Sequence, residues 1–258
     1  MESACAVGAA AGVAFAWLIC WLAIYCAPAS HPRVRPAELA YIRSDPADEP
    51  GSVPWFRLLG FRQTWAFVLG KAMTDPIWLF YLFWLPKFLD ASFGVKLAGL
   101  AAPLVVIYLV ADVGSVGGGW LSSWLIARGW TVNRGRKTAM LLAALAIVPT
   151  MFATRAGSMW MAVAIVSLAA AAHQWWSCNL FTTVSDMFPR KAVASVTGLG
   201  GFAGAMSAML FQRLTGYVLD ATGSNYSIIF IICGSAYITA WLVIHTLVPR
   251  LVPARLSS

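Results

Sequence analysis

Lys71 and Asp75 carry opposite charges and stand four positions apart in an otherwise apolar stretch of the chain. Residues four apart on a helix share a face, so the two side chains can meet. An ionisable group inside a membrane-spanning helix costs about 2.5–3.5 kcal/mol to insert, which makes each one a candidate for function. The sequence leaves two interpretations open. Lys71 attracts an anion while Asp75 balances its charge, or the two form a structural ion bridge.

Asp112 is a second acidic residue in the middle of an apolar stretch, and no basic residue lies within one helical turn of it. A carboxyl group in such a place could take up and release a proton. Alternatively, it hydrogen-bonds a neighbouring helix or pairs with Lys71. The sequence does not decide between these roles.

Residues 173–186 form the most polar stretch inside any apolar run. At helical spacing, one face carries His173, Trp176 and Ser177. Another carries Asn179, Thr182, Thr183 and Asp186. With Gln174, this stretch offers imidazole, amide, hydroxyl and indole groups that could bind a polar ligand. The same groups could instead hydrogen-bond across helices, as polar residues in membrane bundles often do.

The elements that must position these residues are long apolar helices. Residues 138–154, 156–185 and 221–249 contain no Asp, Glu, Lys or Arg, and 60% of the chain is hydrophobic. About 18 apolar residues suffice for a helix to cross a bilayer, and backbone groups in lipid must be satisfied within the helix. We therefore predict an all-α membrane protein. Its seven spans are about 4–27, 63–86, 99–126, 138–154, 158–182, 193–219 and 225–248.

Basic residues fall mostly in alternate connections between these spans. Thirteen of the 18 Lys and Arg residues lie on one side and three on the other. The side with more of them is predicted to be cytoplasmic, which puts the C-terminus inside. The net charge of +8 therefore does not indicate nucleic-acid binding. The five Cys are scattered, and no spacing predicts a metal site, a cofactor or a disulfide framework.

The domain organisation follows from the spans. Residues 1–27 form one helix, 28–62 a proline-rich cytoplasmic linker, 63–248 a six-helix bundle and 249–258 a cytoplasmic tail. Within the linker, Ala37–Arg43 could form one short helix at the membrane surface. A first span with its N-terminus outside suggests a truncated chain.

Three segments resemble transporters of the major facilitator superfamily. Lys71–Pro86 (KAMTDPIWLFYLFWLP) is similar to the seventh helix of hexuronate transporters in the anion:cation symporter family. Ala111–Ser122 (ADVGSVGGGWLS) is similar to the eighth, and His173–Pro189 (HQWWSCNLFTTVSDMFP) to the tenth. Gly135–Arg136–Lys137 matches part of a cytoplasmic loop signature, although Ser123 stands where the family commonly has an acidic residue.

The resemblance implies the last helix of an N-terminal bundle followed by the C-terminal six-helix bundle of a twelve-helix protein. It also implies proton-driven symport of a sugar acid such as glucuronate, by alternating access, in a bacterial plasma membrane. The expected partners are the sugar acid, protons, the lipid bilayer and a missing N-terminal six-helix half. No enzyme activity is expected, because no hydrolase or nucleophile motif is present.

With the resemblance, the candidate residues can be assigned expected roles. The expected substrate contacts are Lys71, Tyr81, Gln174, Trp176, Ser177 and Asn179. The expected ion-coupling candidates are Asp75, Asp112 and His173. Two alternatives remain open: symport of another organic anion, such as an aldonate or a tartrate-like acid, and a seven-span receptor or scaffold that does not transport.

Overall fold

The computed structural model describes residues 2–44, 53–96 and 99–255, with side chains from residue 11 onward. Residues 45–52 of the predicted linker and residues 256–258 of the predicted tail lie outside the described residues. The chain divides into two compact units, Met1–Glu49 and Pro50–Ser258. Each unit is described separately below.

The described residues of the first unit form two helices, α1 (Glu2–Ile24) and α2 (Pro36–Ile42). Proline is favoured at the first position of a helix, where its missing N–H is not needed, and Pro36 begins α2 in this way. Along α1, the rings of Trp17, Trp21 and Tyr25 stack one turn apart, with centroids separated by 5.6 and 4.8 Å. The short helix predicted within the linker is confirmed by α2.

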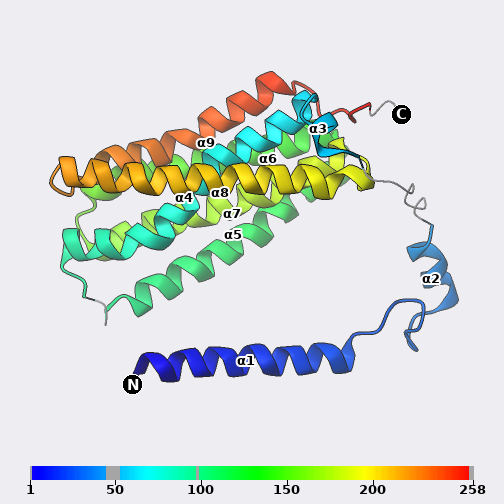
Figure 1. Cartoon of the computed structure of the whole chain (residues 1–258), viewed down its shortest axis with the longest axis horizontal. Helices are drawn as coiled ribbons and strands as arrows, with labels where there is room; N and C mark the ends of the chain where they lie inside the picture. The colour runs from blue at the N-terminus through cyan, green and yellow to red at the C-terminus, as the bar shows by residue number, and fades with distance from the viewer. Residues whose placement is uncertain (1, 45–52, 97–98, 256–258) are drawn as a thin grey trace. The chain divides into compact units, whose positions relative to one another are not determined.

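The second unit opens with the single turn α3 (Trp55–Leu58) and continues as long helices that run side by side (Figure 1). These helices are α4 (Arg62–Phe93), α5 (Ala101–Ala127), α6 (Val132–Ile147), α7 (Met159–Met187), α8 (Arg190–Ala221) and α9 (Ser227–Leu247). A 3₁₀ segment, η2 (Val148–Arg155), continues α6. Within the described residues the chain has helices and no strand.

Six helices of the described chain are long and apolar enough to cross a membrane, counting α6 with η2 as one. A shorter apolar helix, Ala11–Ile24, belongs to α1. The predicted fold class, an all-α membrane protein of about seven spans, is confirmed.

Several helix ends differ from the prediction: α6 begins at Val132 instead of residue 138, and α7 ends at Met187 instead of residue 182. Two further differences lie near a proline. Helix α4 was expected to end at Pro86 but continues to Phe93, because Leu85, Phe88 and Leu89 on either side of this proline are buried. Helix α6 gives way to the 3₁₀ segment η2 one residue before Pro149. Proline has no N–H to continue the α-helical ladder, so the backbone tightens there.

Glycines let two pairs of helices pack closely. A Cβ at Gly114 of α5 would overlap backbone atoms of Ala171, and one at Gly118 would overlap Trp175, both on α7. A Cβ at Gly200 of α8 would overlap the Phe67 ring on α4. Gly114 and Gly118 on α5, like Gly200 and Gly204 on α8, are four residues apart, the small-xxx-small spacing that lets membrane helices approach closely.

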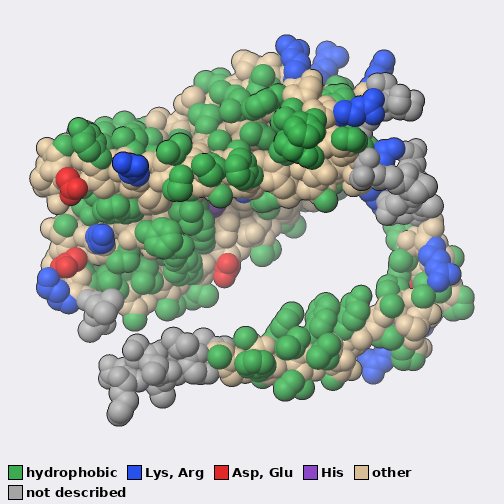
Figure 2. All heavy atoms as spheres, viewed as in Figure 1, with side chains coloured by type: hydrophobic (Ala, Val, Ile, Leu, Met, Phe, Trp, Pro, Cys, Tyr) green, Lys and Arg blue, Asp and Glu red, His purple; other side chains and the backbone are tan. Residues whose placement is uncertain are grey.

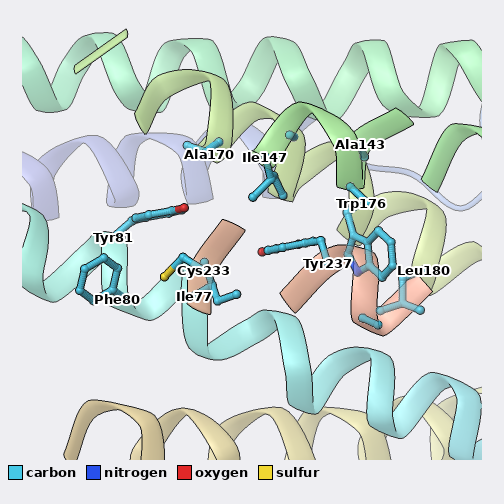
Figure 3. Close-up of a cluster of buried hydrophobic side chains, with 14 of the residues drawn as sticks. Ile77, Phe80, Tyr81, Ala143, Ile147, Ala170, Trp176, Leu180, Cys233 and Tyr237 are labelled. Carbon is cyan, nitrogen blue, oxygen red and sulfur yellow. The ribbon is translucent and has the colours of Figure 1, made fainter. Parts of the chain in front are cut away.

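The core of the second unit lies between α4, α6, α7 and α9. Figure 3 shows side chains from these four helices converging, among them Tyr81, Ile147, Trp176 and Tyr237. Trp176 and Tyr237 are fully buried and meet edge to face, with ring centroids 5.5 Å apart. Helices α5 and α8 are the least buried of the six and flank this core.

Lys and Arg side chains gather at the end of the second unit that carries α3 and the C-terminal segment (Figure 2). There Lys137 of α6 donates to the carbonyls of Val248 and Pro249, just beyond the last turn of α9. The N–H of Leu251 donates to Asn133, and the N–H of Ala254 donates to the carbonyl of Met187. The segment after α9 is thus bonded to the ends of both α6 and α7.

At the same end, Arg136 joins three helices. Its Nε lies 3.1 Å from Oδ2 of Asp186 on α7, and its Nη1 donates to the Ser122 hydroxyl of α5 at 2.8 Å. Ser123 stands where the family that the sequence resembles commonly has an acidic residue. In this chain the acidic partner of Arg136 is Asp186.

We expect Asp186→Ala to lower the free energy of unfolding by about 2 kcal/mol, because a mostly buried arginine loses its partner. Only 14% and 20% of the Arg136 and Asp186 side chains are exposed. The matched control is Asp90→Ala, which removes a pair to Lys96 of similar length, 2.8 Å, but with side chains 48% and 81% exposed. That change should cost less than about 1 kcal/mol. Thermal unfolding in detergent checks both variants, and equal losses would contradict this account of Arg136.

Candidate ligand-binding site

An open pocket of about 340 Å³ lies between α4, α7 and α8. It brings together five of the residues that the sequence analysis selected: Lys71, Asp75, His173, Gln174 and Ser177. The rest of its lining is Trp78, Leu79, Gly201, Gly204 and Ala205. The pocket is therefore polar on α4 and α7, and formed by small residues on α8.

The charged part of the pocket is an ion pair on one helix. Nζ of Lys71 lies 2.8 Å from Oδ2 of Asp75, one turn further along α4, so the predicted shared face is confirmed. Lys71 also lies over the Phe181 ring, 4.4 Å from its centroid. The side chains are 10% and 22% exposed, so the pair is largely desolvated yet still borders the pocket. An anion that enters the pocket can therefore contact Lys71 directly.

Helix α7 supplies the uncharged polar groups. His173 is buried, and its ring stacks on the Trp78 ring with centroids 5.1 Å apart and planes 11° apart. Within the described part of the chain, the side chains of Gln174 and Ser177 have no protein hydrogen-bond partner. One amide and one hydroxyl are thus free to bind a ligand.

Helix α8 lines the pocket with small residues that have no polar side chain. A Cβ at Gly204 would overlap the Asp75 carboxylate, so this glycine allows the ion pair to lie against α8. Gly201, one turn earlier, has nothing near its missing side chain and leaves the pocket open. Small residues on α8 therefore determine both the place of Asp75 and the width of the pocket.

Three residues expected to contact the ligand do not line this pocket. Tyr81 is buried, and its hydroxyl lies 3.2 Å from that of Thr150 on η2. Trp176 is fully buried against Tyr237. Asn179 points toward α5 and donates to the carbonyl of Gly118 at 3.1 Å.

Asp112 lies apart from the pocket as well. It is exposed on α5, and no ion pair or hydrogen bond to it is present among the described residues. It therefore does not pair with Lys71, whose partner is Asp75. Its role in ion coupling stays a prediction.

The structure adds residues that sequence reasoning missed. Trp78 was not among the residues selected from the sequence, yet it lines the pocket and stacks on His173. Tyr237, on the mostly apolar α9, contacts Nδ1 of His173 through its hydroxyl. No local signal marks Tyr237, because its role depends on a contact 64 residues away.

A second, larger pocket of about 510 Å³ lies between α4, α8 and α9. Its lining is apolar apart from Ser207, so it lacks groups that could bind an anion. In the described part of the chain, no three His, Cys, Asp or Glu residues are grouped so that they could hold a metal ion. The polar pocket beside Lys71 is therefore the better candidate site.

No family model matches the chain. The chain is similar to curated proteins, however. It is 27% identical over 218 residues to the hexuronate transporter of Escherichia coli K12, covering 82% of this chain and 50% of that protein. It is 24% identical over 233 residues to the D-galactonate transporter of Escherichia coli O6:H1, covering 85% and 54%. It is 26% identical over 228 residues to a probable galactarate/D-glucarate transporter of Escherichia coli K12, covering 82% and 50%.

The chain thus spans about half the length of the curated relatives it matches. Those relatives bear the names of transporters of different sugar acids. The resemblance to sugar-acid transporters of the major facilitator superfamily, indicated by the sequence motifs, is therefore confirmed.

Proposed function

We propose that this chain supplies one helical half of a sugar-acid transporter, and that the pocket beside Lys71 is its part of the substrate site. The observation that carries the proposal is the grouping of a desolvated lysine with an amide, a hydroxyl and an imidazole in one open pocket. A sugar acid presents one carboxylate and several hydroxyls, which these groups complement.

In this proposal, Lys71 binds the substrate carboxylate, and Gln174 and Ser177 bind hydroxyls. The Trp78 ring borders the same pocket and can stack on the sugar. Without a ligand, the negative charge of Asp75 balances the positive charge of Lys71. When a substrate carboxylate arrives, it competes with Asp75 for Lys71, so binding and the protonation of Asp75 become linked. This linkage is the route by which protons could be coupled to uptake.

The second unit would form one of two bundles that enclose the substrate in turn. The domain limits of 1–27, 28–62, 63–248 and 249–258 belong to this proposal, with the linker and the tail on the cytoplasmic side of a bacterial plasma membrane. The excess of Lys and Arg at one end of the second unit supports that orientation (Figure 2). The missing N-terminal half would supply the other wall of the cavity.

The test is sugar-acid binding by the purified chain in detergent, measured by calorimetry with glucuronate as the probe. We expect Lys71→Met to weaken binding about 10- to 100-fold, because a charge-assisted hydrogen bond contributes about 1.5–3 kcal/mol. Lys96→Met is the matched control, since it removes a lysine in an ion pair of the same 2.8 Å length outside the pocket. Its affinity for glucuronate should equal that of the unchanged chain.

Two results would contradict the proposal. One is glucuronate binding that Lys71→Met leaves unchanged. The other is failure of the chain to bind any sugar acid at millimolar concentration. Coupling is tested in vesicles that contain this chain together with a complementary half from a relative, where an inward proton gradient should drive uptake of labelled glucuronate. Uptake by vesicles with this chain alone would contradict the half-site proposal.

A further inference from the structure

His173 is held from two sides. On one side its ring stacks on Trp78 of α4, with centroids 5.1 Å apart. On the other its Nδ1 lies 2.6 Å from the hydroxyl oxygen of Tyr237 on α9. The residue is 4% exposed. The ring therefore has a fixed orientation. What remains open is which of its two nitrogens carries a proton.

Tyr237 links His173 to the backbone of the helix that carries the ion pair. The Tyr237 hydroxyl also lies 3.3 Å from the carbonyl oxygen of Thr74, which stands between Lys71 and Asp75 in the sequence. A tyrosine hydroxyl has a single proton, and a carbonyl can only accept. Both contacts are hydrogen bonds in one arrangement: Tyr237 donates to Thr74, and Nδ1–H of His173 donates to Tyr237.

This arrangement decides the chemistry of the other ring nitrogen. A neutral imidazole with its proton on Nδ1 has a lone pair on Nε2, which then acts only as an acceptor. A second proton would add a positive charge to a buried ring that shares a pocket with Lys71. Within the described residues, Nε2 has no protein partner, although His173 lines the pocket. An unpaired acceptor nitrogen that is not enclosed by protein atoms can be reached by a hydroxyl donor of a ligand in the pocket.

We propose that Tyr237 and Thr74 hold His173 as the Nδ1–H tautomer, so that its Nε2 accepts a ligand hydroxyl and selects sugar monoacids over sugar diacids. The choice of ligand rests on the function proposed above. Among the described residues that line the pocket, Lys71 is the only cation, and Asp75 already balances its charge. A diacid would bring a second carboxylate toward an acceptor nitrogen and into a pocket with no further cation.

The tautomer is tested directly by nitrogen NMR of the chain labelled with ¹⁵N-histidine. The chain has three His residues, and His173→Gln identifies the signals of His173 by their loss. We expect the Nδ1 signal to be that of a protonated nitrogen and the Nε2 signal that of an unprotonated one. In Tyr237→Phe, the support for Nδ1–H is gone and the Nε2 signal should move toward the protonated range.

Tyr81→Phe is a matched control for that variant. It also removes one hydroxyl from a buried tyrosine of the same core, where the partner is Thr150 instead of His173 (Figure 3). The His173 signals should stay where they are. A protonated Nε2 in the unchanged chain would overturn the inference, even if glucuronate binding depends on Lys71.

The ligand preference is tested with gluconate and glucarate, which differ only at C6, a hydroxyl in one and a carboxylate in the other. We expect the unchanged chain and Tyr81→Phe to bind gluconate at least about tenfold more tightly than glucarate. In Tyr237→Phe the two affinities should come within about threefold. Equal affinities in the unchanged chain would overturn the selection while leaving a Lys71-dependent site in place. Binding of neither acid would contradict the proposed function itself, and the selection with it.

Discussion

Gly114→Ala should separate α5 from α7 and lower the free energy of unfolding by about 3 kcal/mol. Overpacking a close contact costs about 1–3 kcal/mol, and occasionally more. This change belongs at the upper end, because the new Cβ would overlap the Ala171 backbone, which cannot rotate away as a side chain would. Small residues at membrane helix contacts allow this approach, and any Cβ there forces the two helices apart.

The matched control is Gly117→Ala, three residues along the same helix, where no atom lies within 4 Å of the added methyl group. That change should be neutral or slightly stabilising, because alanine is the better helix former. Thermal unfolding of both variants in the same detergent measures the difference. If the two variants unfolded at the same temperature, the close contact between α5 and α7 would not be a determinant of stability.

Trp176→Ala should lower the free energy of unfolding by about 3 kcal/mol without changing the affinity of the folded protein for a sugar acid. Truncating a buried tryptophan removes a large apolar volume and leaves a cavity. Trp176 is fully buried against Tyr237 in the core (Figure 3). It is not among the residues that line the pocket.

Trp78→Ala is the opposite case. Trp78 is only half-buried and lines the pocket, so its loss should weaken glucuronate binding by about tenfold at a smaller cost in stability. Calorimetry and thermal unfolding on the same two preparations separate the outcomes. Weaker ligand binding by Trp176→Ala than by Trp78→Ala would mean that the sequence-based choice of Trp176 was correct after all.

The sequence predicts the membrane spans better than it predicts which residues line the pocket. Long uncharged runs are a strong signal, because lipid leaves a helix as the available backbone structure. The spans were therefore predictable, although the ends of α4, α6 and α7 were not. The polar face of α7 is a weaker signal. Helix α7 packs against α4, α5 and α6, and periodicity cannot tell which neighbour each polar residue faces. Asn179 bonds to α5 and Trp176 enters the core, while His173, Gln174 and Ser177 reach the pocket.

The features that the sequence could not predict depend on contacts between helices that are distant in the sequence. Lys71 and Asp75 were predictable as a pair because the helix repeat alone places them together. Tyr237 was not, because nothing in α9 distinguishes one aromatic residue of an apolar helix from another. The α8 wall was missed for a similar reason. Gly204 shapes the pocket by having no side chain, and a sequence shows only that a glycine is there.

The bonds that Lys137, Asn133 and Met187 make to residues 248–254 have a practical consequence for handling this protein. An affinity tag or fluorescent reporter fused directly after α9 would displace these bonds and expose a buried ammonium group. The same fusion placed beyond residue 255 would leave these hydrogen bonds in place. Purification and imaging of this protein therefore call for attachment points that spare residues 248–254.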